Sequence, residues 1–310
     1  MILLMANVEK LCIISLLKEY GGLNMKNVKR RVSSLLLVSL LIICSTMGIV
    51  GCSSSKSSTT TDAASVEASQ AAKLEKATVY VFVAASLKNS MTTIQDMYSK
   101  VQPNVTIVLN PDSSGTLKTQ IDEGATCDIF FSAAMKQMND LNTEGLIESS
   151  SIAKVLENQV VLIKPRGSTT PVTSFETITK AKNIALAGED VPVGAYAREI
   201  FKSLGISDKV MAMEINQGAN VTAVLAAITE GSNEVGVVYA TDAASVASKI
   251  DIIASAPSGS LTTPVIYPVG LVKNKDASPA QTAAAKDFIA YLQTDEVTSI
   301  FTGYGFSKAK

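Results

Sequence analysis

Hydrophobic positions in residues 78–239 follow two alternating spacings. Short apolar, β-branched runs such as Thr78–Ala84 (TVYVFVA) have the length and composition of buried strands. Between these runs, apolar residues recur three or four positions apart, as Leu87, Met91, Ile94 and Tyr98 do, which predicts helices. The predicted strands are 78–84, 105–109, 128–131, 160–164, 184–187, 211–215 and 235–239. The predicted helices are the one that carries Leu87 to Tyr98, then 116–123, 135–143, 174–180, 195–204 and 221–230.

Strands that alternate with helices predict an α/β fold, with parallel sheets covered by helices on both faces. About 230 residues of alternation is long for one doubly wound sheet. The pattern therefore predicts two doubly wound α/β lobes.

A different pattern occupies residues 1–51. From Met25 the chain reads MKNVKRR, then an apolar core, then IVGC, which are the three parts of a secretory signal peptide. A transmembrane helix is the alternative, but the apolar run Leu35–Val50 is short and interrupted by small polar residues. We expect a signal peptide that starts at Met25, preceded by an upstream extension over residues 1–24.

The end of the signal region resembles a bacterial lipobox. Ile49–Gly51 precedes Cys52, which would be lipidated and become the first mature residue. Residues 52–77 are rich in Ser, Thr and Ala with few large apolar residues, which predicts a flexible tether. The expected location is therefore extracytoplasmic and anchored to the cell membrane, on a Gram-positive surface or in a Gram-negative periplasm.

Composition narrows the possible functions. The 310 residues include no His, which excludes a Ser-His-Asp triad, a Cys-His pair and any His-containing zinc site. The whole chain has 27 Lys plus Arg against 28 Asp plus Glu, which argues against a nucleic-acid partner. Without residues 1–51 the balance is 21 against 26, a formal charge of −5. Cys127, beside an apolar run, is expected to be a buried free thiol.

Four strand-to-helix junctions share small or hydroxyl-bearing residues. They are 84–87, 112–116, 191–194 and 218–221. Ligands of open α/β sheets bind beyond the carboxyl ends of the strands, and unpaired N–H groups at helix N-termini attract anions. Ordinary helix capping would explain any one junction. Four such junctions, in two halves of the chain, favour a shared anion site.

The donors at these junctions are neutral. Hydroxyls come from Ser86, Ser114 and Tyr239, and backbone N–H groups from Val193 and Val221. Because a fully ionised oxyanion has only acceptors, this set favours a deprotonated tetrahedral dianion in an enclosed cleft. Four carboxylates are close enough in sequence that one could face the site: Asp112, Glu189, Asp190 and Asp242.

Several stretches also resemble a known family. They are VFVAASL (81–87), SSGTLKTQIDEGATCDIFFSA (113–133), GEDVPVGAYARE (188–199), NVTAVLAAITEG (220–231), EVGVVYATDA (234–243) and IFTGYGF (300–306). In order and spacing they resemble the substrate-binding protein of the bacterial molybdate ABC importer. The resemblance implies a type II periplasmic-binding-protein-like fold with two crossover strands near 160–164 and 265–272. Lobe 1 would hold 78–158 with 269–310, and lobe 2 would hold 159–268.

The resemblance also implies a ligand and its contacts. Molybdate or tungstate would bind the five donor residues, with Ser114 giving both its hydroxyl and its N–H group; Tyr239 ranks highly mainly through the resemblance. Gly115 stands where relatives often have serine, and Val193 where alanine is common. The expected partner is an ABC transporter permease, and the protein is expected to be a monomer without a cofactor or direct cation ligands.

Two alternatives remain open at this point. The first is another tetrahedral oxyanion, such as sulfate, thiosulfate or phosphonate, because the sequence does not give the cleft radius. The second is a serine hydrolase, in which Ser86 or Ser114 is the nucleophile and Lys118, one helical turn beyond Ser114, is the base. No buried acid–base pair is evident, so we expect that the protein is not an enzyme.

Overall fold

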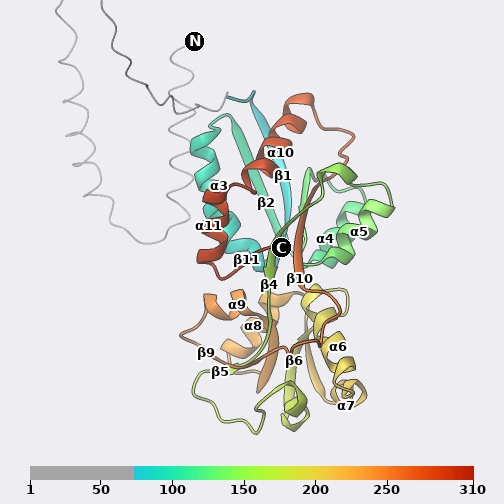
Figure 1. The fold of residues 1–310 in the computed structure, drawn as a ribbon, viewed down its shortest axis with the longest axis vertical. Helices are drawn as coiled ribbons and strands as arrows, with labels where there is room; N and C mark the ends of the chain where they lie inside the picture. Colours follow the sequence, from blue (N-terminus) through green and yellow to red (C-terminus); the bar gives the residue numbers. More distant parts are fainter. Residues whose placement is uncertain (1–72) are drawn as a thin grey trace, which may run out of the picture. The chain divides into compact units, whose positions relative to one another are not determined.

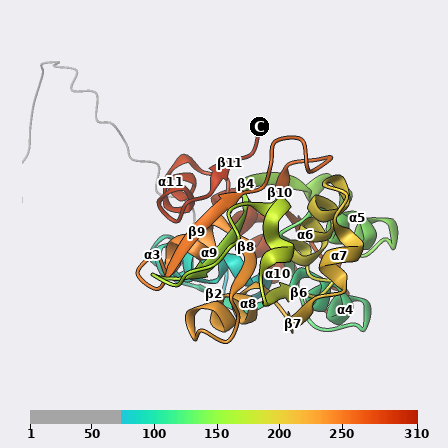
Figure 2. The ribbon, with the colours of Figure 1, turned by 90° about the horizontal axis from the view of Figure 1, so that it is seen from below.

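The computed structural model describes residues 73–310, which form two α/β lobes (Figure 1). The predicted signal peptide with its start at Met25, the lipidation site Cys52 and the tether up to residue 72 lie outside these residues. Each lobe is built around one sheet, and helices pack on the sheet faces, as the view from below also shows (Figure 2).

Lobe 1 contains a six-stranded sheet in the order β11-β4-β10-β3-β1-β2. Its strands are β1 (Ala77–Ala84), β2 (Val105–Asp112), β3 (Ile129–Phe131), β4 (Ala153–Asn158), β10 (Val265–Leu271) and β11 (Ser307–Lys308). Its helices are η1 (Ala85–Leu87), α3 (Lys88–Val101), α4 (Ser114–Asp122), α5 (Met135–Thr143), η2 (Ser149–Ser151), α10 (Pro279–Tyr291) and α11 (Asp295–Gly303).

Lobe 2 contains a five-stranded sheet in the order β7-β6-β8-β5-β9. Its strands are β5 (Val160–Pro165), β6 (Asn183–Ala187), β7 (Glu214–Gly218), β8 (Val235–Tyr239) and β9 (Ile250–Ser255). Its helices are η3 (Phe175–Lys180), α6 (Pro192–Ser203), α7 (Ser207–Met211), α8 (Val221–Thr229) and α9 (Ala240–Ser245).

The two α/β lobes are confirmed, but both sheets are mixed rather than wholly parallel. Strand β1 pairs in parallel with β2 and β3, and β6 pairs in parallel with β7 and β8. By contrast, β10 runs antiparallel to β3 and β4, and β5 runs antiparallel to β8 and β9. The chain leaves lobe 1 through β4 and enters lobe 2 through β5, and it returns through β9 and β10. Because the outgoing and returning strands run in opposite directions, they pair antiparallel.

The chain passes between the lobes twice. The first passage is Gln159, between the end of β4 and the start of β5, and the second is residues 256–264, between β9 and β10. Pairing places β5 in the sheet of lobe 2 and β10 in the sheet of lobe 1. The lobe boundary expected after residue 268 therefore falls inside β10.

One predicted strand is displaced. The apolar residues of 211–215 indicated a strand, but Ser207–Met211 forms the short helix α7, and β7 covers Glu214–Gly218. Strand β7 lies at the edge of its sheet and most of its side chains are exposed or half-buried, so apolar composition marks it poorly.

The core follows the predicted spacing. Strands β8 and β10 are buried at every position, as expected for continuous apolar runs covered on both faces. Helix α3 buries Met91, Ile94 and Tyr98 from one side, and each such side chain contributes about 1.5–3 kcal/mol by burial. Cys127 is confirmed as a buried free thiol, and burial raises the pKa of that thiol.

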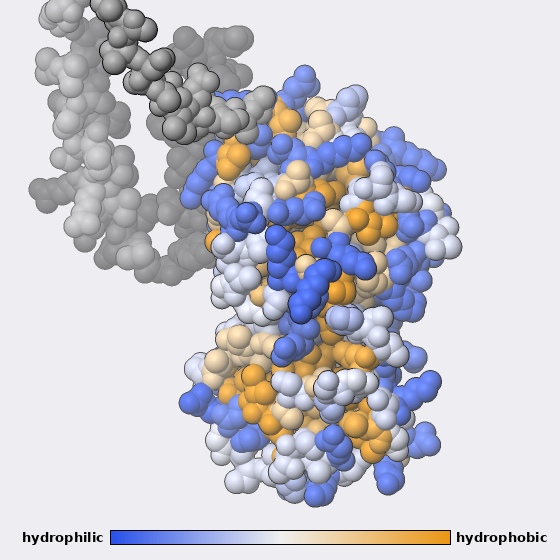
Figure 3. Space-filling view, viewed as in Figure 1, coloured by the Kyte–Doolittle hydropathy of each residue, from blue (hydrophilic) through white to orange (hydrophobic). Residues whose placement is uncertain are grey.

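The surface differs between the lobes and the level where they meet. Figure 3 shows polar residues over much of both lobes and apolar residues gathered at the narrower level between them. A groove of about 570 Å³ is lined from both lobes, by Gln137, Lys154, Pro192, Tyr196 and Ile266 among others. Among residues 73–310, no helix combines the length and the apolarity needed to cross a membrane.

Candidate anion-binding site

The structure brings the four predicted junctions to the interlobe region. In lobe 1, η1 follows β1 and α4 follows β2; in lobe 2, α6 follows β6 and α8 follows β7. Helix α8 contacts η1 across the lobes, and Asn220 before α8 donates from Nδ2 to Oδ1 of Asp112 at 3.0 Å. The junctions of both lobes therefore face one another.

Ser114 is oriented as a hydrogen-bond donor. It is the first residue of α4, and the preceding Ser113 caps this helix by accepting from the N–H of Thr116 at 3.0 Å. The Ser114 hydroxyl oxygen accepts from the N–H of Ala133 at 3.0 Å, and the residue is 1% exposed. Because that oxygen already accepts a bond, its own proton is available for a ligand, together with the first-turn N–H group.

Ser86 belongs to a chain of hydrogen bonds in lobe 1 that also includes Tyr267 and Asn158. Its Oγ lies 2.9 Å from the hydroxyl of Tyr267 in β10, which in turn accepts from Nδ2 of Asn158 at 3.1 Å. Either hydroxyl can be the donor at this distance; where Tyr267 donates to Ser86, the Ser86 proton is left for the cleft. Such chains strengthen each bond cooperatively. Phe306 packs edge-on against the Tyr267 ring, with the centroids 5.3 Å apart.

Val193 and Val221 offer backbone N–H groups at two helix N-termini. Val193 is the second residue of α6, and Val221 is the first residue of α8, where the N–H groups have no partner within the helix. Asn220 caps α8 by accepting from the N–H of Ala223 at 3.0 Å, so this cap does not occupy the Val221 N–H. A Cβ on Gly194 would overlap the backbone oxygen of Gly188, so glycine lets α6 start close against β6.

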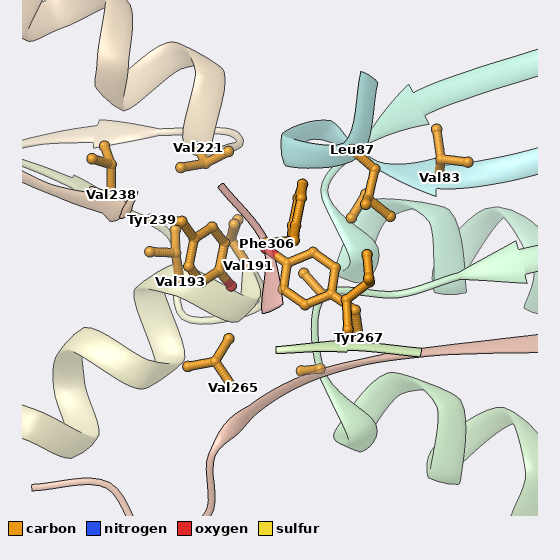
Figure 4. Packing of buried hydrophobic residues seen from close by; sticks show 14 of the residues in the cluster. Val83, Leu87, Val191, Val193, Val221, Val238, Tyr239, Val265, Tyr267 and Phe306 are labelled. Carbon is orange, nitrogen blue, oxygen red and sulfur yellow. The ribbon is translucent and has the colours of Figure 1, made fainter. Parts of the chain in front are cut away.

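Tyr239 presents a buried hydroxyl at the carboxyl end of β8. The residue is 1% exposed, and its hydroxyl makes no hydrogen bond of good geometry among the described residues. Burial raises the pKa of this hydroxyl well above its ordinary value, and the Tyr267 hydroxyl lies near enough to raise it further, so it stays protonated and can donate. Its ring meets that of Tyr267 edge-on at 5.8 Å, and Figure 4 shows the two rings between Val193 and Val221 on one side and Leu87 on the other.

The four nearby carboxylates have different surroundings. The carboxylate of Asp112 accepts from Ser113 N–H at 2.7 Å and from Asn220, and Glu189 and Asp190 are exposed. Asp242 in α9 is buried, and its Oδ2 has no partner within residues 73–310. Burial raises the pKa of Asp242 to about 7, against opposing backbone hydrogen bonds at Tyr239 and Asp242. A neutral Asp242 would remove a negative charge from the neighbourhood of the site.

The cation that a serine hydrolase would need is engaged elsewhere. Nζ of Lys118 lies 2.6 Å from the carboxylate of Asp122 and 2.9 Å from that of Glu144. These ion pairs engage Lys118 as a protonated cation, which does not suit the role of base in the serine-hydrolase alternative. The donors of the site are therefore neutral hydroxyls and N–H groups, which suit an anion that is held and not transformed.

Some supporting residues escaped the sequence prediction. Tyr267 and Asn158 orient Ser86, and Asn220 both caps α8 and contacts Asp112. Gln137 of α5 donates from Nε2 to the backbone oxygen of Asp190 at 3.4 Å. The sequence carried a signal for Asn220, which lies where a helix cap is expected, but none for the other three, whose partners are 53 to 181 residues away.

Two α/β lobes with candidate neutral donors between them suit a solute-binding protein, and comparison with known proteins shows that class. The model of the family "Bacterial extracellular solute-binding protein" matches residues 79–307, and the chain belongs to this family. Members of this family bind and deliver solutes for transport, so the chain is a transport component and not an enzyme, as predicted.

Two relatives and one solved structure are similar to most of the chain. The chain is 36% identical over 260 residues to YvgL of Bacillus subtilis (strain 168), whose name describes an ABC transporter substrate-binding lipoprotein; this covers 84% of the chain and 93% of YvgL. It is 35% identical over 237 residues to the molybdate-binding protein ModA of Haemophilus influenzae, covering 74% and 90%. A Clostridium difficile substrate-binding domain assigned to a molybdenum ABC transporter shares 32% identity and a TM-score of 0.58, covering 76% of the chain and all of that domain.

Proposed function

We propose that this protein captures molybdate, or the similarly sized and charged tungstate, between its lobes and delivers it to an ABC transporter permease. The ligand contacts would be the Ser86 hydroxyl, the Ser114 hydroxyl and N–H, the N–H groups of Val193 and Val221, and the Tyr239 hydroxyl. The similarity to a molybdate-binding relative supports the identity of the anion.

The observation that carries the proposal is the unpartnered hydroxyl of Tyr239. A buried polar group without a hydrogen bond costs about 1–3 kcal/mol, and few are found in folded proteins. An oxyanion oxygen would satisfy this hydroxyl. Ser114, whose own oxygen is already engaged, would donate to the same ligand from the opposite lobe.

The test is a thermal-shift titration with molybdate, tungstate, sulfate and phosphate at equal ionic strength. A ligand at free concentration L that binds only the folded state stabilises it by RT ln(1 + L/Kd), so the midpoint of unfolding rises with the logarithm of the ligand concentration once this exceeds the Kd. We expect molybdate and tungstate to raise the midpoint at micromolar concentrations, and sulfate and phosphate to act only at much higher concentrations. A midpoint that sulfate raises more than molybdate would assign the cleft to a smaller oxyanion.

We also propose that Cys52 anchors the protein, as a monomer, to the outer face of the cell membrane. The lipobox-like sequence before Cys52 and the lipoprotein relative from Bacillus subtilis support the anchor. The wild type should incorporate labelled fatty acid, and a Cys52→Ser variant should not. A wild-type protein that stays in the membrane fraction without incorporating fatty acid would instead indicate a transmembrane segment.

A further inference from the structure

The lobes approach each other closely beside Asp190. Gly115 is the second residue of α4 in lobe 1, and Asp190 lies in the loop before α6 in lobe 2. A Cβ on Gly115 would overlap the backbone oxygen of Asp190 and lie 2.9 Å from its carbonyl carbon. Real Cβ atoms do not approach backbone so closely, and Gly115 does not need glycine for its backbone angles, since its φ is outside the left-handed region. At the lobe spacing of this structure, position 115 therefore has room for glycine but not for a Cβ, so the serine found in relatives would need the lobes to lie slightly further apart.

Two polar contacts flank this approach. Nε2 of Gln137 donates to the same Asp190 oxygen at 3.4 Å, and Nδ2 of Asn220 donates to Asp112 at 3.0 Å. Each contact joins one lobe to the other, so each is lost when the lobes separate. We refer to these five residues together, Asp112, Gly115, Gln137, Asp190 and Asn220, as the closure contact.

The closure contact adjoins the proposed anion donors in the sequence of both lobes. Gly115 follows Ser114, and Asn220 precedes Val221. Hydrogen bonds to an oxyanion need donor distances of about 2.7–3.2 Å, so an added separation of about 1 Å would break those made by one lobe. The spacing between the lobes at the closure contact therefore sets the distance between the two halves of the donor set.

We propose that Gly115 and Asn220 are positioning residues, which set how far the lobes close and thereby whether one anion can reach the donors of both. This inference rests on the proposed function, because it concerns the same site. Closure in binding proteins moves rigid lobes about a few hinge residues, so one steric contact at the rim can limit the whole motion.

The first test is Gly115→Ala, with Gly303→Ala as the matched control. Both glycines lie in helices, but a Cβ on Gly303 would meet no heavy atom within 4 Å. Alanine favours a helix over glycine, so neither change should lower the thermal stability of the free protein. We expect Gly115→Ala to weaken molybdate binding at least tenfold in calorimetry and to reduce the anion-induced decrease in radius of gyration. Gly303→Ala should bind as the wild type does.

The second test separates the polar contact from the helix cap. Asn220→Ser keeps a good N-cap but loses the donor to Asp112, and should weaken binding by roughly two- to tenfold. Asn220→Asp also keeps a cap, but it sets two carboxylates against each other across the lobes and should weaken binding further. Adding Asp112→Asn to Asn220→Asp restores one donor and one acceptor, and should recover most of the affinity.

The outcomes distinguish this inference from the proposed function. If the wild type binds molybdate and Gly115→Ala binds it within twofold, or if the double variant recovers nothing, the closure contact does not position the anion. If the wild type binds none of molybdate, tungstate, sulfate and phosphate, the proposed function fails and the inference fails with it. Weakened binding by Gly115→Ala with unchanged free-state stability supports both.

Discussion

The two lobes supply different kinds of donor. Lobe 1 offers the side-chain hydroxyls of Ser86 and Ser114, and each is oriented by a further hydrogen bond, to Tyr267 or from Ala133. Lobe 2 offers the first-turn N–H groups of α6 and α8 and the unpartnered hydroxyl of Tyr239. Lobe 1 is therefore an oriented half-site whose bonds exist without a ligand, whereas lobe 2 keeps groups that only a ligand would satisfy.

Buried carboxylates show the same contrast. Asp128 in lobe 1 is 2% exposed, and its oxygens accept from the N–H of Tyr80, from Asn274 and from Gln281, at 2.8–3.0 Å. Asp242 in lobe 2 is also buried, but its Oδ2 has no partner among the described residues. Satisfied groups stabilise the free protein, and unsatisfied ones cost stability until something neutralises or binds them.

The largest expected effect concerns Asp242. Its pKa is about 7 in the folded protein and near 3.8 when unfolded, so between these values the folded state binds more protons. The free energy of unfolding should therefore fall as pH rises from about 4 through about 7, by up to ~4 kcal/mol at about 1.4 kcal/mol per pKa unit. Asp242→Asn should remove this slope in urea unfolding measured from pH 4 to 8.

The control for Asp242 is its partnered counterpart. Asp128→Asn replaces one acceptor oxygen by a donating NH2 group that faces other donors, and should destabilise the protein at every pH in the same range. If Asp242→Asn were less stable than the wild type at pH 8, the Oδ2 atom of Asp242 would have a partner that the contrast between the lobes denies.

The next effect is that of Ser114→Ala in lobe 1. It removes a donor to the anion and also leaves the Ala133 N–H without its acceptor. We expect molybdate affinity to fall by roughly 10- to 100-fold, and the free energy of unfolding of the free protein to fall by about 1–3 kcal/mol. Calorimetry and urea unfolding measure the two. Ser299→Ala on the exposed side of α11 should change neither, and equal effects of the two variants would refute the assignment.

Tyr239→Phe in lobe 2 should separate binding from stability. It removes a hydroxyl with no partner within residues 73–310, so the free protein should be as stable as the wild type or slightly more so. Molybdate affinity should fall about tenfold. Tyr267→Phe is the comparison, because it breaks bonds to Ser86 and Asn158 and should cost about 1 kcal/mol of stability. A loss of stability in Tyr239→Phe without a loss of affinity would show that its hydroxyl is structural.

The smallest effect on binding is expected at the backbone donors. Val193→Ala and Val221→Ala keep the N–H groups and should change molybdate affinity by less than about threefold. Both side chains are buried, at 1% and 3% exposure, so each truncation should still lower the free energy of unfolding by about 1–3 kcal/mol. A loss of affinity as large as that of Ser114→Ala would mean that these side chains, and not their N–H groups, shape the site.

Local patterns predicted most of the elements and the junctions. Helix α5 covers the predicted residues, and β1, β5, β6, β8 and α8 differ from the prediction by one residue or less at each end. Strands β4 and β9 escaped prediction because about half or more of their positions are only half-buried or exposed, which leaves no continuous apolar run. The antiparallel pairing of β5 with its neighbours, and of β10 with its neighbours in the other sheet, was not predicted. The alternation of strands and helices does not indicate where the chain passes from one lobe to the other.

The candidate site also combines residues that local sequence patterns predicted and residues that they did not. Ser86, Ser114, Val193 and Val221 could be picked out because helix N-termini follow strands at recognisable sequences. Tyr239 ends a strand like many buried tyrosines, and resemblance to a family was needed to single it out. Tyr267, Asn158 and the partners in the closure contact act through contacts between distant parts of the chain, which no local pattern reports.

The most direct test of the account is a calorimetric titration of the purified protein with molybdate and, separately, with sulfate. Neutral donors drawn from both lobes should enclose one dianion. We therefore predict one molybdate per protein, with a Kd at least tenfold below that for sulfate. Failure of molybdate to bind, or binding that Ser114→Ala and Tyr239→Phe both leave unchanged, would contradict the claim that this cleft holds the anion.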